Sequence, residues 1–487
     1  MHKRAKIVAT IGPASSSEQM LGDLLEAGVD VVRLNFSHGD HASHRAVMRT
    51  VRRQAEARQR FVPIIVDLMG PRHRLGQLEP RRLEAGESIV LGAASAEGVD
   101  LPVEDDEFLD HLKADERVLV DNGLVELKIV SVEQRRLRAE VLHGGMVSTR
   151  KGINLPDTEL PFTISDKDRA DIALAVEEKV DYLAVSFVGG PADLRAVAEV
   201  VREHGGLIPL IAKLERSTVM RRLNETVEVA DAVMVARGDL GVEVPPHRVP
   251  VMQKRILEAG KRFGKPVIVA TQMLESMMTQ PRPTRAETSD VANAVFDGAD
   301  ALMLSGETAA GDFPLEAVGT MARVIQEAEA YRPPEGYRLT RDRVEHLNPG
   351  ATEERYLNPR RDRHLEIPEV VSAAAVHAVR NLDTRQIVAF SQGGFTARMI
   401  ARYRPMTPIT VFTRNIEVAR RIQLVWGAQP VLMEHEVKHH DEVVQVVDRM
   451  LVERDLAQPG DTIVILMGDP IIHRPLTNLI RIHRVRG

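Results

Sequence analysis

The sequence predicts an α/β protein with a (β/α)8 TIM barrel, an inserted small β-barrel lid domain and a C-terminal open-sheet α/β domain. Short apolar segments rich in β-branched residues alternate eight times with amphipathic helical patterns, as a closed parallel barrel requires. One interruption contains short strands separated by Gly and Asn-Gly turns, which indicates an all-β module. A second alternating run follows, and 487 residues are too many for a single core.

The eight predicted barrel strands are nearly continuous apolar runs, which is typical of strands buried on both faces. They comprise residues 6–12, 31–37, 63–68, 181–187, 207–215, 231–239, 266–273 and 299–307. The carboxyl ends of such strands face one mouth, so the polar side chains at these ends are expected to form the active site. These side chains are Arg33, Asn35, Ser37, Asp67, Lys213, Glu215, Asp239, Thr271 and Glu307.

Changes in the pattern give the expected domain boundaries. The barrel comprises residues 1–71 and 161–332, and the lid domain comprises residues 72–160. Because the lid is inserted after the third barrel strand, we expect it to cover the mouth of the barrel. Residues 333–366 are rich in Pro, Arg and Glu and predict an exposed linker, and residues 367–487 form the C-terminal domain.

Composition excludes several functional classes. The net charge of −6 gives no global basic field, so a nucleic-acid partner is not expected. The chain has no cysteine, which excludes disulfides and thiolate metal sites and fits a reducing compartment. The N-terminal run IVATIG is too short for a signal peptide, and no segment approaches the roughly 18 apolar residues of a membrane span. We therefore expect a soluble cytoplasmic protein without a membrane partner.

The segments AKLE and MVARGDLG contain the candidate catalytic and metal-binding residues. Lys213 and Glu215 lie two apart on one strand, so their side chains leave the same face. Glu215 and Asp239 end adjacent strands, and two carboxylates suit Mg²⁺. A metal with lysine and arginine is typical of phosphoryl transfer. The alternative is a structural Lys–Glu ion pair, which is less favoured because buried charge is costly. Backbone N–H groups at 238–241 are able to hold a substrate carboxylate.

Several segments resemble the pyruvate kinase family. They are KIVATIGPAS, VVRLNFSHG, RKGINLP, AKLE, MVARGDLGVE, ATQMLESM, PRPTRAETSDVANAVFDGADALMLSGETAAG and IARYRP, and they cover the barrel almost end to end. The resemblance implies transfer of the phosphoryl group of phosphoenolpyruvate to ADP, giving pyruvate and ATP in the last step of glycolysis. It also implies a cytoplasmic homotetramer with an allosteric, regulatory C-terminal domain.

The resemblance implies a role for each residue at the barrel mouth. Arg33 would contact the transferring phosphoryl group, and Lys213 would neutralise it in the transition state. Glu215 and Asp239 would hold Mg²⁺ or Mn²⁺. Thr271 would relay a proton to the enolate through water. The residues implied for substrate binding are Arg33, Lys213, Gly238, Asp239 and Thr271.

The nucleotide and effector sites follow from the same resemblance. The nucleotide site would be lined by Asn35, His38, Arg74 and Lys151. The loop SQGGFT in the C-terminal domain would bind a phosphorylated effector, a sugar phosphate or a nucleotide. Its residues are Ser391, Gln392, Gly393, Gly394, Phe395 and Thr396. The alternative interpretation of this loop is an ordinary helix N-cap.

One segment departs from the family. Most members have Asp-Thr-Lys-Gly-Pro-Glu-Ile-Arg after the third strand, whereas residues 67–74 here read DLMGPRHR, with Arg72 at the position of the glutamate. Family members hold K⁺ through positions that match Asn35, Ser37, Asp67 and the carbonyl of Leu68. A subgroup with lysine instead of the glutamate works without added K⁺. We therefore hypothesise that Arg72 replaces K⁺ with a fixed charge. The alternative is that Arg72 points outward and K⁺ binds as usual.

Two other functions remain open at this point. The altered third-strand motif allows a catalytically silent relative that binds phosphoenolpyruvate or nucleotide and signals through its C-terminal domain. A metal-dependent keto-acid lyase would share the Glu215 and Asp239 pair, but it does not explain the lid or Lys151.

Overall fold

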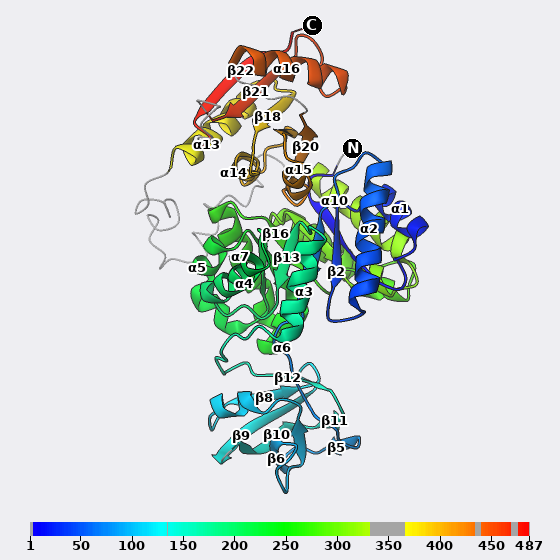
Figure 1. Cartoon of the computed structure of the whole chain (residues 1–487), viewed down its shortest axis with the longest axis vertical. Coiled ribbons are helices and arrows are strands. Elements are labelled where there is room, and N and C mark those ends of the chain that lie inside the picture. Colours follow the sequence, from blue (N-terminus) through cyan, green and yellow to red (C-terminus); the bar gives the residue numbers. More distant parts are fainter. Residues whose placement is uncertain (1–2, 134, 332–365, 434–439, 469–475, 487) are drawn as a thin grey trace. The chain divides into compact units, whose positions relative to one another are not determined.

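The computed structural model describes residues 3–133, 135–331, 366–433, 440–468 and 476–486 (Figure 1). These residues divide into two compact units. One unit comprises Ile7–Glu287 with Ala301–Val318, and it contains the lid and most of the barrel. The other comprises Met1–Lys6, Thr288–Asp300 and Gly319–Gly487. The predicted linker 333–366 lies outside the described residues, except for residue 366.

Eight parallel strands form a closed barrel, which confirms the predicted fold class. Their order around the barrel is β1-β17-β16-β15-β14-β13-β3-β2. Their bounds are β1 Lys6–Ile11, β2 Val31–Asn35, β3 Ile64–Asp67, β13 Tyr182–Val185, β14 Leu210–Leu214, β15 Ala232–Ala236, β16 Val267–Ala270 and β17 Ala301–Leu304. Each strand ends at least one residue earlier than the sequence pattern predicted, and some residues beyond the strand ends belong to short helices, as Asp239 does to α6 and Glu307 to α9.

Helices connect the barrel strands. The longer ones are α1 Glu18–Ala27, α2 His41–Ala57, α3 Asp166–Glu177, α4 Pro191–Glu203, α5 Leu223–Val229, α7 Val249–Phe263, α8 Arg285–Phe296 and α10 Pro314–Ala330. Short helical turns follow several strands: η2 Ser217–Arg222, α6 Arg237–Glu243, η3 Pro246–Arg248, η4 Glu275–Met278 and α9 Gly306–Ala309. The side-chain cap of α3 is a capping box, in which Ser165 and Asp168 bond each other's backbone N–H.

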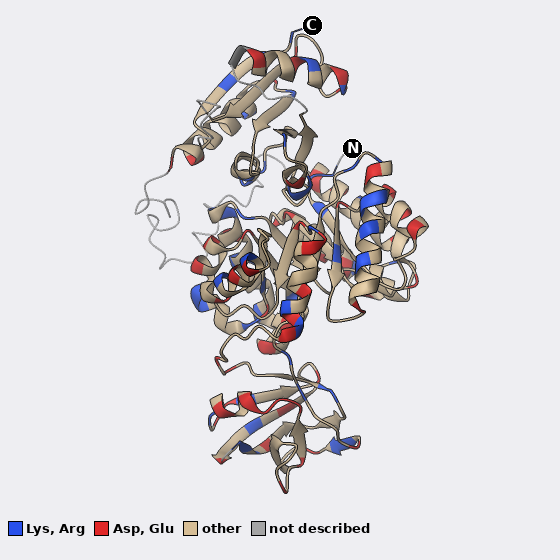
Figure 2. Cartoon of the chain, in the orientation of Figure 1, with Lys and Arg blue, Asp and Glu red and all other residues tan. Residues whose placement is uncertain are grey.

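Figure 2 shows basic residues along α2, all of which are arginines. These arginines have acidic partners. Arg52 lies 2.7 Å from Asp181, and Arg58 lies 2.9 Å from Glu26. The basic surface of α2 is therefore explained by ion pairs within the barrel rather than by an anionic ligand.

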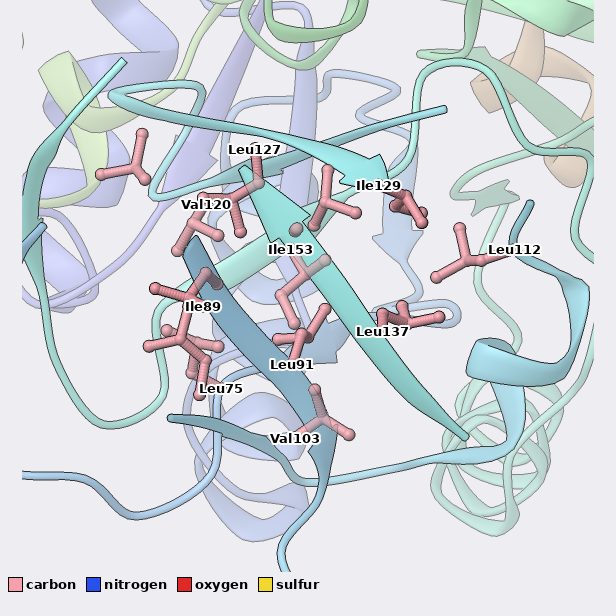
Figure 3. Close-up of a cluster of buried hydrophobic side chains, with 14 of the residues drawn as sticks. Leu75, Ile89, Leu91, Val103, Leu112, Val120, Leu127, Ile129, Leu137 and Ile153 are labelled. Atoms are coloured by element: carbon pink, nitrogen blue, oxygen red, sulfur yellow. The ribbon is translucent and has the colours of Figure 1, made fainter. Parts of the chain in front are cut away.

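The lid is a small closed β structure, as predicted. Its elements are β4 His73–Arg74, β5 Arg81–Leu83, β6 Ser88–Ala93, β7 Leu101–Val103, η1 Glu107–His111, β8 Arg117–Val120, β9 Val125–Glu133, β10 Arg136–His143, β11 Gly145–Val147 and β12 Gly152–Asn154. Seven strands pair in the order β4-β12-β8-β9-β10-β6-β7. A bridge between Leu75 and Val103 joins the two edges of this sheet. Buried Leu91, Leu127 and Leu137 belong to the core that fills the lid (Figure 3).

The C-terminal domain is an open sheet with helices, which also confirms the prediction. Its elements are α13 Ile367–Asn381, β18 Gln386–Phe390, α14 Phe395–Ala401, β19 Ile409–Thr413, α15 Ile416–Ile422, β20 Ala428–Leu432, α16 His440–Glu453, β21 Thr462–Met467 and β22 Leu479–Arg484. The order is β20-β19-β18-β21-β22, and β22 is antiparallel to β21. In the part of the chain that the structure describes, no helix has the length and apolar character needed to span a membrane.

Candidate active site

Strands β2, β3 and β14 bring a buried network of charges together; β2 and β3 are neighbours in the barrel, and β13 lies between β3 and β14. Arg33 lies on β2, and its Nε and Nη2 both lie 2.7 Å from Asp67 Oδ2 at the end of β3. Lys213 on β14 places its Nζ 3.1 Å from Asp67 Oδ1 and 2.9 Å from Glu215 Oε1. Asp67 therefore links Arg33 and Lys213, the two cations that the family resemblance assigns to the phosphoryl group. All four side chains are buried.

The charges in this network fix one another's ionisation. Burial opposes ionisation of Asp67, but the charges of Lys213 and Arg33 outweigh it and lower the pKa of this carboxyl. Burial likewise disfavours the ammonium of Lys213, but Asp67 and Glu215 outweigh it and raise its pKa. Lys213 is therefore a cation and Asp67 an anion at neutral pH.

Glu215 and Asp239 fit a divalent metal by their donor chemistry. Burial raises the pKa of Glu215; Lys213 opposes this, and the negative charge of Asp239 adds to it. A cation between the two carboxylates would relieve their repulsion. Among the described residues, no group of three or more His, Asp or Glu side chains is placed to bind one ion. A metal held by Glu215 and Asp239 would take water and substrate as its other ligands, as Mg²⁺ prefers.

Thr271 and the start of α6 lie side by side. Gly238 N donates to Thr271 Oγ1 at 2.7 Å, and this hydroxyl donates to Ala270 O at 2.6 Å. Thr271 and Gln272 have φ values of 66° and 54°, a costly conformation for residues other than glycine. Arg237 Nη2 stabilises this backbone conformation by donating to the carbonyls of Thr271 and Gln272, at 2.8 and 3.0 Å.

A cleft of about 560 Å³ lies between the lid and the barrel. Its lining includes Arg72, His73, Arg74, Asp121, Asn122, Lys151, Phe187, Arg216, Asp239 and Glu243. Lys151 Nζ lies 2.6 Å from Asp121 Oδ2, and Arg74 Nη1 donates to the carbonyl of Arg150 at 3.0 Å. The cleft thus joins lid cations to the candidate metal ligand Asp239.

Comparisons with known proteins agree with this geometry. A family model described as "Pyruvate kinase, barrel domain" matches residues 2–318, and one described as "Pyruvate kinase, alpha/beta domain" matches residues 369–483. The chain belongs to the pyruvate kinase family. A pyruvate kinase from Geobacillus stearothermophilus is 38% identical over 493 residues, which cover 99% of this chain and 80% of that protein. One from Staphylococcus aureus is 37% identical over 490 residues, with the same coverage.

A solved structure gives the same result. The crystal structure of a pyruvate kinase from Cryptosporidium parvum matches with a TM-score of 0.88 and 33% identity. The match covers 99% of this chain and 96% of that one. The family that the sequence segments suggested is therefore confirmed.

The structure separates the residues that family resemblance assigned to the nucleotide. Arg74 and Lys151 line the cleft, whereas Asn35 and His38 are not among its lining residues as described. Asn35 Oδ1 accepts from Ser37 N at 3.2 Å, and the carbonyl of His38 lies 2.8 Å from a ring nitrogen of His44. Their assignment to the nucleotide site of this pyruvate kinase stays a prediction.

Arg72, which departs from the usual pyruvate kinase motif, is exposed. Its guanidinium lies 6.0 Å from the centre of the Phe187 ring. The cations that contact Asp67 are Arg33 and Lys213. The structure therefore does not place Arg72 on this carboxylate, and its replacement of K⁺ stays a prediction.

Sequence reasoning missed three residues of this pyruvate kinase site. Ser186 accepts from Lys213 Nζ at 2.7 Å and donates to Leu68 O at 2.7 Å. A serine at a strand end gives no distinctive signal. Arg237, described above, directly precedes Gly238, and Glu243 lies one helical turn beyond Asp239. Those spacings were available signals. Burial raises the pKa of Glu243 to about 7; the Ser217 N–H opposes the rise, while Glu215 and Asp239 add to it.

The predicted effector loop of the pyruvate kinase C-terminal domain connects β18 to α14. Gly394 caps α14 with φ of 78° and makes no side-chain cap. Thr396 Oγ1 lies 2.7 Å from Thr477 Oγ1, and both side chains are buried. Neither observation identifies a ligand, so both interpretations of this loop stay predictions.

Proposed function

We propose that this protein transfers the phosphoryl group of phosphoenolpyruvate to ADP, the last step of glycolysis. The observation that carries the proposal is the buried, charged ammonium of Lys213. Its Nζ lies 2.9 Å from Glu215 Oε1, and Asp67 links it to Arg33. Phosphoryl transfer depends mostly on positioning and charge neutralisation, and this cluster offers both. Membership of the pyruvate kinase family supports the same reaction.

Each residue at the site would have a distinct role in this reaction. Glu215 and Asp239 would hold Mg²⁺ or Mn²⁺, which neutralises phosphate oxygens when bound. Lys213 and Arg33 face the phosphoryl group as the O–P bond of phosphoenolpyruvate breaks and the bond to ADP forms. Thr271 then relays a proton through water to the carbon of the enolate, giving pyruvate.

The substrates would approach from two sides. The Gly238 and Asp239 amides, beside the Thr271 hydroxyl, would bind the carboxylate of phosphoenolpyruvate. Arg74 and Lys151 would bind nucleotide phosphates in the cleft, and Asn35 and His38 would contact the nucleotide from outside this lining. The ion pair of Lys151 with Asp121 supports this, because it keeps the ammonium at the cleft before nucleotide binds.

We also propose that catalysis does not require K⁺, with Arg72 supplying a fixed positive charge. Arg72 lines the cleft, and the Leu68 carbonyl already accepts a hydrogen bond from Ser186. In the alternative, Arg72 points outward and K⁺ binds as usual, through Asn35, Ser37, Asp67 and the carbonyl of Leu68. Activity in potassium-free buffer separates the two.

Family membership supports three further proposals. The protein would act in the cytoplasm, as a homotetramer, and would respond to a phosphorylated effector at Ser391–Thr396. Each is open to direct measurement, by fractionation, by sedimentation and by titration with sugar phosphates.

One assay tests the reaction itself. Phosphoenolpyruvate, ADP and Mg²⁺ are supplied, and pyruvate is followed through lactate dehydrogenase. We expect one pyruvate for each ATP. Lys213→Gln should lower turnover about 10³-fold. Lys128→Met should leave it unchanged, because Lys128 is a half-buried lid lysine paired with Asp115. Binding of phosphoenolpyruvate without turnover would instead establish a silent relative.

A further inference from the structure

The lid returns to the barrel through residues 155–161, and this return segment is tied firmly to the lid. Asp157 accepts hydrogen bonds from the backbone N, Nε and Nη2 of Arg117, at 3.1, 2.9 and 2.8 Å. Thr158 Oγ1 donates to Glu116 Oε2 at 2.8 Å. Because these bonds join the segment to the start of β8, a movement of the segment moves the lid.

The barrel holds the same segment from the other side. Arg216 Nη2 donates to Thr158 O at 3.1 Å, and Ser217 Oγ donates to Pro156 O at 3.1 Å. Both donors directly follow Glu215. The candidate metal ligand and the two groups that hold the lid are therefore three consecutive residues.

The second candidate metal ligand, Asp239, is also connected to Ser217. Ser217 N donates to Glu243 Oε2 at 3.0 Å. Glu243 ends α6, the short helix that carries Asp239 near its start. The end of β14 and the helix α6 thus meet at Ser217, so a change at either carboxylate is transmitted to one residue.

Burial makes this contact well defined. Arg216 is only 9% exposed, so its guanidinium cannot exchange its partners freely for water. A hydrogen bond from a charged donor is stronger than a neutral one, and the planar guanidinium fixes its direction. At the other connection of the lid, Arg72 is exposed and lies over the Phe187 ring. The return segment is therefore held on its barrel side by a buried guanidinium, whereas the guanidinium at the other connection is exposed.

We propose that Arg216 and Ser217 form a latch through which metal binding at Glu215 and Asp239 sets the position of the lid. They act as positioning residues, because their side chains donate to the lid backbone and not to reacting atoms. When the two carboxylates close on a metal, β14 and α6 are drawn together, and the latch holds residues 156–158 in place. The coupling rests on the metal site proposed above.

A competing role for Arg216 is direct binding of a substrate anion, since it lines the cleft. Ser217→Ala separates the two roles, because it removes one latch bond without changing charge. Arg216→Met removes the other. Arg222→Met is the matched control, since Arg222 is an exposed arginine on the same 3-10 helix, η2.

Hydrogen exchange on the metal-free full chain tests the latch alone. We expect amides of residues 155–160 to exchange about fivefold faster or more in Ser217→Ala and Arg216→Met than in the wild type. Arg222→Met should match the wild type. Equal exchange in all four proteins would overturn the latch. So would weaker ADP binding in Arg216→Met together with unchanged exchange in Ser217→Ala, because Arg216 would then be an anion contact.

Addition of Mg²⁺ tests the coupling. We expect Mg²⁺ to slow exchange of residues 155–160 in the wild type and in Arg222→Met, and to have less than half that effect in the two latch variants. A wild type that turns over with Mg²⁺ but shows no slowing would overturn the coupling and leave the proposed reaction intact. A wild type without turnover would contradict the reaction, while the metal-free experiment would still decide the latch.

Discussion

Lys213 Nζ lies 2.9 Å from Glu215 Oε1, and the two residues point into the barrel mouth from the end of one strand. The same ammonium lies 3.1 Å from Asp67, so one cation is shared by two buried carboxylates. Removing it would leave both carboxylates without their shared partner, and this has consequences for catalysis and for stability.

Lys213→Gln is therefore expected to lower kcat by about 10³-fold, the loss typical of a group that neutralises transition-state charge. The free energy of unfolding should also fall by about 3 kcal/mol, because a buried charge loses its partner. Steady-state kinetics and chemical denaturation measure the two effects. A variant that kept more than a tenth of the wild-type kcat would contradict the role of Lys213.

Thr271 gives a second prediction. Its hydroxyl lies between Gly238 N and the Ala270 carbonyl. Thr271→Ala should lower kcat about 100-fold through loss of the proton relay, and Thr271→Ser should restore most of it. Exchange of solvent deuterium into pyruvate measures this step directly. If serine does not rescue, the methyl group or the backbone conformation is what matters, and the relay is excluded.

Glu243 predicts a pH dependence of stability. Burial raises its pKa to about 7 in the folded protein, above the unfolded value of 4.5. The folded state therefore binds more protons than the unfolded state between these pH values. The contribution of Glu243 to the free energy of unfolding is therefore complete below pH 4.5 and is lost as pH rises to about 7. The loss over this range is roughly 3 kcal/mol.

The matched variant for this prediction is Glu243→Gln, which keeps an acceptor for Ser217 N. Measured in metal-free buffer, the difference in unfolding free energy between wild type and variant should shift between pH 5 and 7.5 in favour of the variant. A difference that stays constant over this range would show that Glu243 does not titrate there.

Arg72 predicts the potassium response. The wild type is expected to have at least half of its maximal rate without K⁺. Arg72→Glu restores the acidic residue of the common motif, so its rate should rise at least tenfold with K⁺. Rates in sodium-free tetramethylammonium buffer, with and without KCl, measure both. Strong K⁺ activation of the wild type would instead support the outward position of Arg72.

The strand period was enough to predict that Lys213 and Glu215 share a face, because alternate residues of a strand point the same way. It was not enough to predict the bond from Arg33 to Asp67. That bond depends on β2 and β3 being neighbours and on the burial of both groups. The eight-fold alternation likewise predicted the barrel, and the pattern of short strands predicted the lid.

Loop residues were harder to place. The position of Arg72 over the Phe187 ring could not be predicted, because it is a contact between segments more than a hundred residues apart, and the replacement of K⁺ by Arg72 stays a prediction. Ser186 and Arg216 act through hydrogen bonds to backbone carbonyls, and such bonds leave no pattern in residue type or spacing. These contacts can be identified only when the structure shows how the ends of several strands lie relative to one another.

The central claim is that Glu215 and Asp239 bind a divalent metal beside Lys213. Electron paramagnetic resonance of Mn²⁺ titrated into the protein tests it without relying on activity. The account predicts one tight Mn²⁺ per chain in the wild type, and affinity at least 100-fold weaker in both Glu215→Gln and Asp239→Asn. Unchanged Mn²⁺ binding in folded Glu215→Gln protein would contradict it.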